Sequence, residues 1–264
     1  MSLTGFFLLE TAWRAGAVAS VVLVMAKASQ AVVFHRRFLP AIEGKAPVGA
    51  FFSSVTALFA LFVAFAAADA WSRGDRATEA LGQEARALAA FHAASQVLGV
   101  EAAPLRSVFS AYLGASLRDE WGVSRNTEPS AAAAETLHRL EDASLAGLRR
   151  GAEGAGGSAA LWSELLQRAH DLRAARDTRL RFGKDFGQPW KWVGLLLLTL
   201  SSQVAIAFVH LDRRRTAAVA QAIFGTAAAT ALSIVAGFEG PYGGIGAVQP
   251  TSLLMMHTAT AAAL

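Results

Sequence analysis

The sequence contains no cysteine, and charged residues are scarce: only 17% of its 264 residues are Asp, Glu, Lys or Arg, whereas 54% are hydrophobic. The absence of cysteine excludes disulfides, thiolate metal sites and thiol catalysis, although it leaves the cellular compartment open. A soluble domain of this length would carry about a quarter charged residues. The composition therefore points away from an ordinary soluble domain.

Charge is missing completely from three long segments. No Asp, Glu, Lys or Arg occurs in residues 46–68, 192–211 or 216–238, which are 23, 20 and 23 residues long. A helix needs about 20 apolar residues to cross ~30 Å of hydrocarbon. Each segment is therefore predicted to be a membrane-spanning helix.

A fourth apolar segment, residues 15–34, contains a single charge at Lys27. Glu10 and Arg14 precede it at i, i+4 spacing, so they can neutralise each other near the membrane interface. The alternative is a cleaved signal peptide, because AKASQA offers A-x-A sites after a short apolar core. We interpret the segment as a transmembrane helix.

The chain is thus predicted to be an all-α integral membrane protein whose four transmembrane helices cover about 15–34, 47–70, 190–211 and 216–238. The segment between the second and third spans has no period-2 strand pattern and no repeat, and its apolar residues recur at helical spacing. It is predicted to be an inserted four-helix bundle. The expected parts are residues 1–70 with two spans, the bundle at 71–188, two further spans at 189–239, and an apolar Gly/Pro-containing tail at 240–264.

Within the expected bundle, helix boundaries follow from local signals. Pro104 begins a helix, Ser130 is a candidate N-cap, and the glycine-rich residues 151–158 form a loop. The last helix runs from Ala159 to about Lys184 and is expected to pack through Leu161, Leu165, Ala169 and Leu172.

The formal net charge of +4 does not predict nucleic-acid binding. From Ala70 to Gln188 the acidic and basic residues balance, and the excess lies beside the membrane segments. Arg and Lys that flank a membrane segment fix topology and contact lipid headgroups. The expected partner is the lipid bilayer, and no basic stripe is left for phosphates.

One face of the second span predicts a pore. Five residues fall on it at i, i+7, i+11, i+14 and i+18: Phe51, Leu58, Phe62, Phe65 and Asp69. In a ring of subunits these apolar side chains would form a constriction that gates by dewetting, with a carboxylate ring at one mouth. The opposite face is small (Ser53, Thr56, Ala60, Ala64 and Ala67) and suits close helix packing. Alternatively, the bulky face contacts lipid or neighbouring helices.

Other constellations are weaker. His92, His138 and His170 fall on three different expected helices, so a buried metal site is conceivable, but three unrelated solvated histidines are favoured. Glu84 and Glu120 could pair with Arg176 or Arg179 as a structural salt bridge. No Ser-His-Asp, zinc-protease or phosphate-binding motif is present. The sequence therefore predicts no enzyme, no cofactor and no metal.

Several blocks together resemble the bacterial bestrophin-like domain family. They are VGAFFSSVTALFALFVAFAAADAW, the pair Glu84-Ala85, AYLGASLRDEW, the R-x-x-R-x-R run before the third span, and FEGPYGG, and they cover about residues 45–250. The resemblance implies four spans and a distant kinship with bestrophins, which are pentameric anion channels. The positions that match the family's motifs are Glu84, Tyr112, Glu120, Trp121, Arg176, Pro241, Tyr242 and Gly244.

The topology signals conflict. The short loops His35–Lys45 and Asp212–Arg215 hold six Arg or Lys, so the positive-inside rule places them in the cytoplasm and the bundle outside. The resemblance to bestrophins implies a cytosolic bundle instead. We expect a multi-pass protein of the cell (inner) membrane with an extracytoplasmic bundle.

Three functions are compatible with these observations. The first is a homo-oligomeric ion channel lined by the second span. The second is a non-catalytic accessory or structural subunit of a larger membrane complex. The third is a sensor whose bundle binds an external ligand, and only the architecture supports it.

Overall fold

The computed structural model describes residues 11–35, 49–153, 158–185, 187–243 and 246–261. These residues form helices and no strand, which confirms the predicted all-α fold. Four helices are long and apolar enough to cross a membrane, over Ala12–Val33, Phe52–Val97, Pro189–Val209 and Arg214–Phe238. The four predicted spans are therefore present as helices.

The chain divides into two compact units. The first unit comprises Met1–Ser72 and Phe186–Gly246, and the second comprises Arg73–Asp185 and Ala247–Leu264. Helix α4 (Gly49–Val97) is one uninterrupted helix of 49 residues that contributes to both units.

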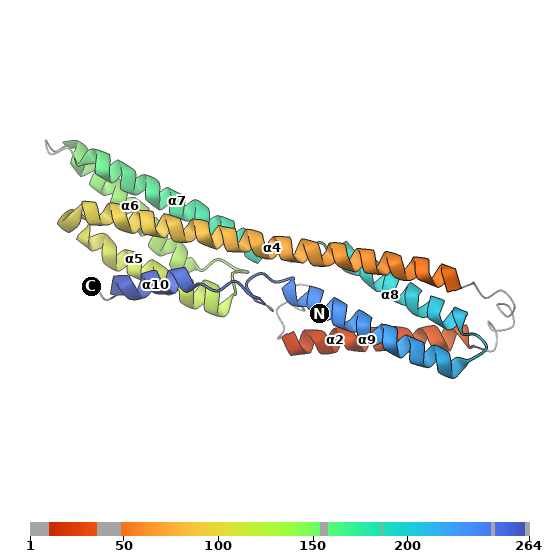
Figure 1. Cartoon of the computed structure of the whole chain (residues 1–264). Helices are drawn as coiled ribbons and strands as arrows, with labels where there is room; N and C mark the ends of the chain where they lie inside the picture. Colours follow the sequence, from red (N-terminus) through yellow and green to blue (C-terminus); the bar gives the residue numbers. More distant parts are fainter. Residues whose placement is uncertain (1–10, 36–48, 154–157, 186, 244–245, 262–264) are drawn as a thin grey trace. The chain divides into compact units, whose positions relative to one another are not determined.

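The first unit contains α2 (Thr11–Val33), the first part of α4, α8 (Pro189–Val209) and α9 (Arg214–Phe238). Helices α2, α8 and α9 pack against one another (Figure 1). Its core is made of mostly small and branched side chains: Val18, Val22, Ala66, Trp192, Leu195, Leu232, Val235 and Ala236. Helix α2 contributes Val18 and Val22 to this core.

Hydrogen bonds between side chains also hold this unit together. The buried Gln221 Nε2 donates to Ser29 Oγ and to the Gln203 carbonyl, both at 2.8 Å, and Gln30 Nε2 donates to Gln221 Oε1 at 2.7 Å. Membrane helices gain little from the hydrophobic effect between one another, so small residues and such polar bonds carry the association.

The second unit contains the rest of α4, a 3-10 turn η1 (Gly99–Ala102), α5 (Ala103–Ala115), a π-helix η2 (Ser116–Val123), α6 (Ala131–Glu153) and α7 (Ala159–Gly183). Two of the local signals are confirmed: Pro104 lies in the first turn of α5, and Ser130 Oγ accepts the Ala133 amide at 3.2 Å as an N-cap. The predicted loop at residues 151–158 is wrong at its start, because α6 continues to Glu153, and residues 154–157 are outside the described residues.

The expected packing face of α7 is wrong at one position. Leu161 is 38% exposed, whereas Trp162 is buried. The reason is close packing on α6, where a Cβ added to Gly147 would lie 2.3 Å from the Trp162 ring. The indole occupies space that only a glycine leaves open.

The C-terminal segment also belongs to the second unit. Helix α10 (Thr251–Ala261) packs against α5 (Figure 1), and Leu253 is completely buried in the core of that unit. Hydrophobicity alone left the position of this tail open, because a segment too short to cross the membrane can pack on protein or lie at an interface.

Candidate functional site

A buried charged network lies in the second unit, centred on Arg179 of α7. The Arg179 guanidinium donates to Glu84 Oε2 of α4 at 2.5 Å, to Glu120 Oε2 of η2 at 2.7 Å and to Ser116 Oγ at 3.2 Å. It also donates to Asn126 Oδ1. Arg179, Glu84, Glu120, Ser116 and Asn126 are all fully buried.

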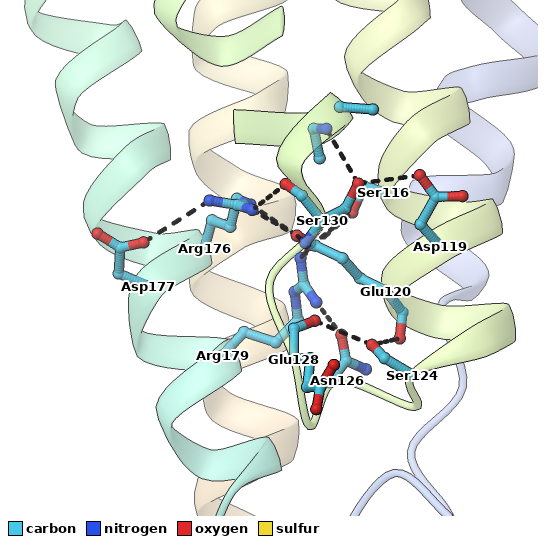
Figure 2. Close-up of polar contacts among 12 residues, drawn as sticks. Ser116, Asp119, Glu120, Ser124, Asn126, Glu128, Ser130, Arg176, Asp177 and Arg179 are labelled. Carbon is cyan, nitrogen blue, oxygen red and sulfur yellow. Dashed lines mark hydrogen bonds and ion pairs between the residues drawn. The ribbon is translucent and has the colours of Figure 1, made fainter. Parts of the chain in front are cut away.

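Arg176, one turn earlier on α7, extends the network. Its Nη2 donates to Glu120 Oε1 at 2.5 Å and to the Ser130 carbonyl at 3.3 Å. The Ser130 amide donates to the same Glu120 oxygen at 3.0 Å. Figure 2 shows both arginines reaching from α7 toward Glu120 and the chain that follows it.

Two aromatic residues, Tyr112 and Trp121, also contact the charged groups of the network. Tyr112 donates its hydroxyl hydrogen to Glu84 Oε1 at 3.1 Å, and the Arg179 guanidinium lies 5.3 Å from the centre of the Trp121 ring. The structure therefore brings five of the motif positions together, namely Glu84, Tyr112, Glu120, Trp121 and Arg176. The predicted pairing of Glu84 and Glu120 with Arg176 and Arg179 is confirmed.

The electrostatics keep these groups in fixed charge states. Burial alone would raise the pKa of the Glu120 carboxyl, but the charge of Arg179 and the hydrogen bonds from Arg176 together lower it. Burial opposes the charged form of Arg179, and the charge and hydrogen bond of Glu84 outweigh it and raise the Arg179 pKa. Burial and the Glu84 charge raise the pKa of Tyr112, so its hydroxyl keeps its proton and donates.

The network joins elements that are distant in the sequence. Two arginines face two glutamates, and the arginine bonds connect α7 to α4, to η2 and to the turn after η2. Buried charges are tolerated when they are paired and hydrogen-bonded. The sequence analysis missed Ser116 and Asn126. The one available signal for Asn126 was its residue type, because asparagine favours turns and tolerates positive φ. In the structure φ is 50° at Arg125 and 60° at Asn126.

The three histidines have separate surroundings. His92 stacks on Phe109, His138 lies 3.4 Å from Asp142, and His170 is exposed. In the part of the chain that the structure describes, no group of three or more His, Cys, Asp or Glu side chains is arranged to hold a metal ion.

The stripe on the second span lies on the open side of α4. Leu58, Phe62 and Phe65 are 53%, 44% and 64% exposed within the chain, and the Asp69 side chain is 45% exposed. The side chain of Phe51 is outside the described residues.

The buried face of α4 differs from the expected small-residue face. Phe59, Ala66 and Ala70 are buried, whereas Ala60 and Ala64 are exposed. The Phe59 ring packs against Phe224 of α9 with centroids 5.4 Å apart. An aromatic contact between helices thus orients α4 in the first unit.

A second ionic cluster includes Asp69, the last residue of the α4 stripe. Lys191, in the first turn of α8, places its Nζ 3.0 Å from Asp69 Oδ2 and also bonds Glu239 Oε1 at the C-terminus of α9. Arg14 of α2 donates to the Ala236 carbonyl at 3.0 Å and to the Gly243 carbonyl at 2.8 Å. Cationic side chains near the last carbonyls of a helix are favourable, because the helix dipole is negative at this end.

The remaining motif positions lie next to this cluster in the sequence. Pro241 and Tyr242 are buried, three residues or fewer after Glu239. Gly244 is outside the described residues, as is Glu10, the expected partner of Arg14.

These features define a helical membrane protein: four helices are long and apolar enough to cross a membrane, the second has an exposed apolar face, and a helical unit contains buried ion pairs. A family model, Bestrophin-like domain, matches residues 17–253, and the chain belongs to this family. Neither the curated proteins nor the solved structures gave a match.

Proposed function

We propose that the protein is an oligomeric ion channel whose pore is lined by α4. The observation that supports this most is the exposed apolar stripe of Leu58, Phe62 and Phe65, which ends at the partly exposed Asp69. The kinship of its family with bestrophins agrees with the proposal.

The burial of the spans also favours α4 as the helix that faces other subunits. In the most hydrophobic window of each span, 11% of the residues are buried for α4, compared with 44% for α8. A helix so little covered by its own chain must be covered by lipid or by other copies. In a symmetric ring, its apolar face would form a constriction that empties of water when closed.

Phe62 is held in position by its own chain. A Cβ added to Gly194 of α8 would lie 3.2 Å from the Phe62 ring, so the ring packs closely against α8 at a position where the glycine has no side chain. The edge of the ring is fixed by α8 while 44% of the residue stays open. An anchored aromatic side chain is suited to set the width of a constriction.

We expect Phe62→Ala to increase ion flux severalfold in liposomes that contain the purified protein, because the truncated side chain widens the constriction. Stability should fall only slightly, because the side chain already lines a lumen. If Phe62 instead fills protein packing, the truncation costs roughly 3–5 kcal/mol and leaves flux unchanged. Flux assays and thermal unfolding of the same preparation separate these results.

The matched control is Ile223→Ala, which truncates an apolar residue that is 68% exposed on α9. This variant should conduct like the unmodified protein. Native mass spectrometry of the complex gives the subunit number. A monomer, or one copy in a complex of other proteins, rules out the pore.

The second candidate is an accessory subunit of a membrane complex. Leu254 and Met255 of α10 favour it, because they are 49% and 66% exposed beside the buried Leu253 and could contact a partner. A single copy found together with other proteins would support this function, and α10 would then be the first surface to mutate.

For the sidedness, we propose an inner-membrane protein with an extracytoplasmic second unit. Reporter fusions at Gly154 should behave as extracytoplasmic and fusions near Glu43 as cytoplasmic, since the short basic loops are retained inside. Both positions are outside the described residues. The opposite pattern would show that the arginines of α7 outweigh those loops.

A further inference from the structure

The cluster of Asp69, Lys191 and Glu239 joins three helices of the first unit at one end of the α4 stripe. Asp69 comes from α4, Lys191 from the first turn of α8, and Glu239 follows the last residue of α9. The Lys191 ammonium therefore forms ion pairs with two carboxylates, Asp69 and Glu239, that are far apart in the sequence.

The three groups differ in their exposure. The Glu239 side chain is completely buried, that of Lys191 is 13% exposed and that of Asp69 is 45% exposed. A carboxylate is also disfavoured at a helix C-terminus, because the dipole there is negative. The Lys191 ammonium at this helix end offsets the negative dipole and contacts the buried Glu239. The same ammonium group faces the more exposed carboxylate of Asp69.

Asp69 is the only one of the three that lies on the α4 stripe, seven residues after Phe62. If α4 lines a pore, the Asp69 carboxylates form a ring at its mouth, and a ring of bare carboxylates attracts cations. Each carboxylate has the Lys191 ammonium 3.0 Å away. The mouth then presents a ring of ion pairs, whose field falls off much faster than that of single charges.

We propose that Lys191 determines the charge selectivity of the channel by compensating Asp69, with the buried Glu239 holding the ammonium in place. This inference rests on the proposed pore. It removes the conflict between an acidic residue at the mouth and the kinship with anion channels.

The test measures reversal potentials of the full-length protein in planar bilayers under a KCl gradient. The double variant Lys191→Gln/Glu239→Gln keeps the net charge and leaves no buried carboxylate without Lys191, while Asp69 loses this cation. We expect its K⁺/Cl⁻ permeability ratio to rise roughly tenfold, the order expected for a ring of carboxylates acting on an ion through water. Adding Asp69→Asn should cancel the rise.

A matched control removes an ion pair of the same charge elsewhere. Glu135→Gln/Arg139→Gln deletes an exposed pair of α6, whose charged atoms are 3.0 Å apart, and should leave the ratio unchanged. Asp69→Asn replaces a partly exposed side chain by one of nearly the same size, so it should assemble normally. It should shift the ratio toward Cl⁻ because Lys191 then lacks this carboxylate.

The outcomes separate this inference from the proposed function. If the unmodified protein conducts and neither the double variant nor Asp69→Asn changes the ratio, Lys191 does not set selectivity although the pore stands. An equal shift in the α6 control would show that loss of any ion pair has this effect, and it would overturn the inference as well. If the unmodified protein does not conduct at all, the pore and the inference are both wrong.

Discussion

Replacing Arg179 with Met is expected to reduce the stability of the protein by roughly 3–5 kcal/mol, because Glu84 and Glu120 lose the cation they share inside the second unit. All three side chains are completely buried, so water cannot take over the lost bonds. For a protein of this size the loss corresponds to a fall in Tm of about 10 °C. Thermal unfolding of the purified protein in detergent, followed by circular dichroism, measures it.

Two further variants make this result specific. Arg139→Met removes an exposed arginine that pairs with Glu135 on α6, and it should leave Tm almost unchanged because exposed ion pairs contribute little. Adding Glu84→Gln to Arg179→Met should recover part of the loss, since one uncompensated carboxylate disappears. A fall in Tm no greater than that of Arg139→Met would show that the network does not hold the second unit together.

Gly183→Ala should also destabilise the protein, by roughly 1–3 kcal/mol, because the last residue of α7 packs directly on the backbone of Asn126. An added Cβ would lie 1.9 Å from the Asn126 carbonyl oxygen and 2.6 Å from its carbonyl carbon. Asn126 cannot yield freely, because its side chain accepts a hydrogen bond from Arg179 and its amide bonds the Glu120 carbonyl at 2.6 Å. The measurement is again Tm.

Gly74→Ala provides the opposite case within a helix. No heavy atom lies within 4 Å of a Cβ added there, and Gly74 is in the interior of α4. Alanine in a helix interior is favoured over glycine by about 0.5–1 kcal/mol, so this variant should raise Tm slightly. If Gly183→Ala behaves in the same way as Gly74→Ala, the close approach of α7 to Asn126 does not limit stability.

The two destabilising variants act on one junction. Both residues belong to α7 and contact Asn126 in the turn after η2: Gly183 allows the close approach of the backbone, and Arg179 donates a hydrogen bond to the Asn126 side chain. Helix η2 is a π-helix, a form that is rare and frequently found at functional sites. The motif positions of this unit thus lie where hydrogen bonds connect α7 to η2 and α4. The exposed apolar stripe of α4 belongs to the first unit.

The sequence by itself determined the class of the protein and its helices. Uncharged runs longer than about 20 residues can satisfy their backbone groups in lipid only as helices, so the spans follow from composition. Pro104 and Ser130 marked helix starts correctly, because the first amides of a helix lack partners within the helix and these residues remove or satisfy one.

The sequence named Arg176 and Arg179 as possible partners of Glu84 and Glu120, and the tertiary structure decided which of these charges meet. The arginines of α7 look alike in the sequence, yet Arg173 bonds Glu141 at 2.6 Å at a partly exposed site, whereas Arg176 and Arg179 are buried with Glu120. Their i, i+3 spacing puts several of them on one side of the helix, but the carboxylates come from elements 32 to 95 residues away. A local pattern cannot specify such partners.

The same reason applies to the first unit. Asp69, Lys191 and Glu239 each stand at the edge of an uncharged run, and nothing in the sequence indicates that the three side chains meet. Their association depends on the packing of α4, α8 and α9, whose ends bring together residues up to 122 positions apart for Lys191 and Asp69. Composition and periodicity determined the helices, and side-chain packing between helices distant in the sequence determined the ion pairs.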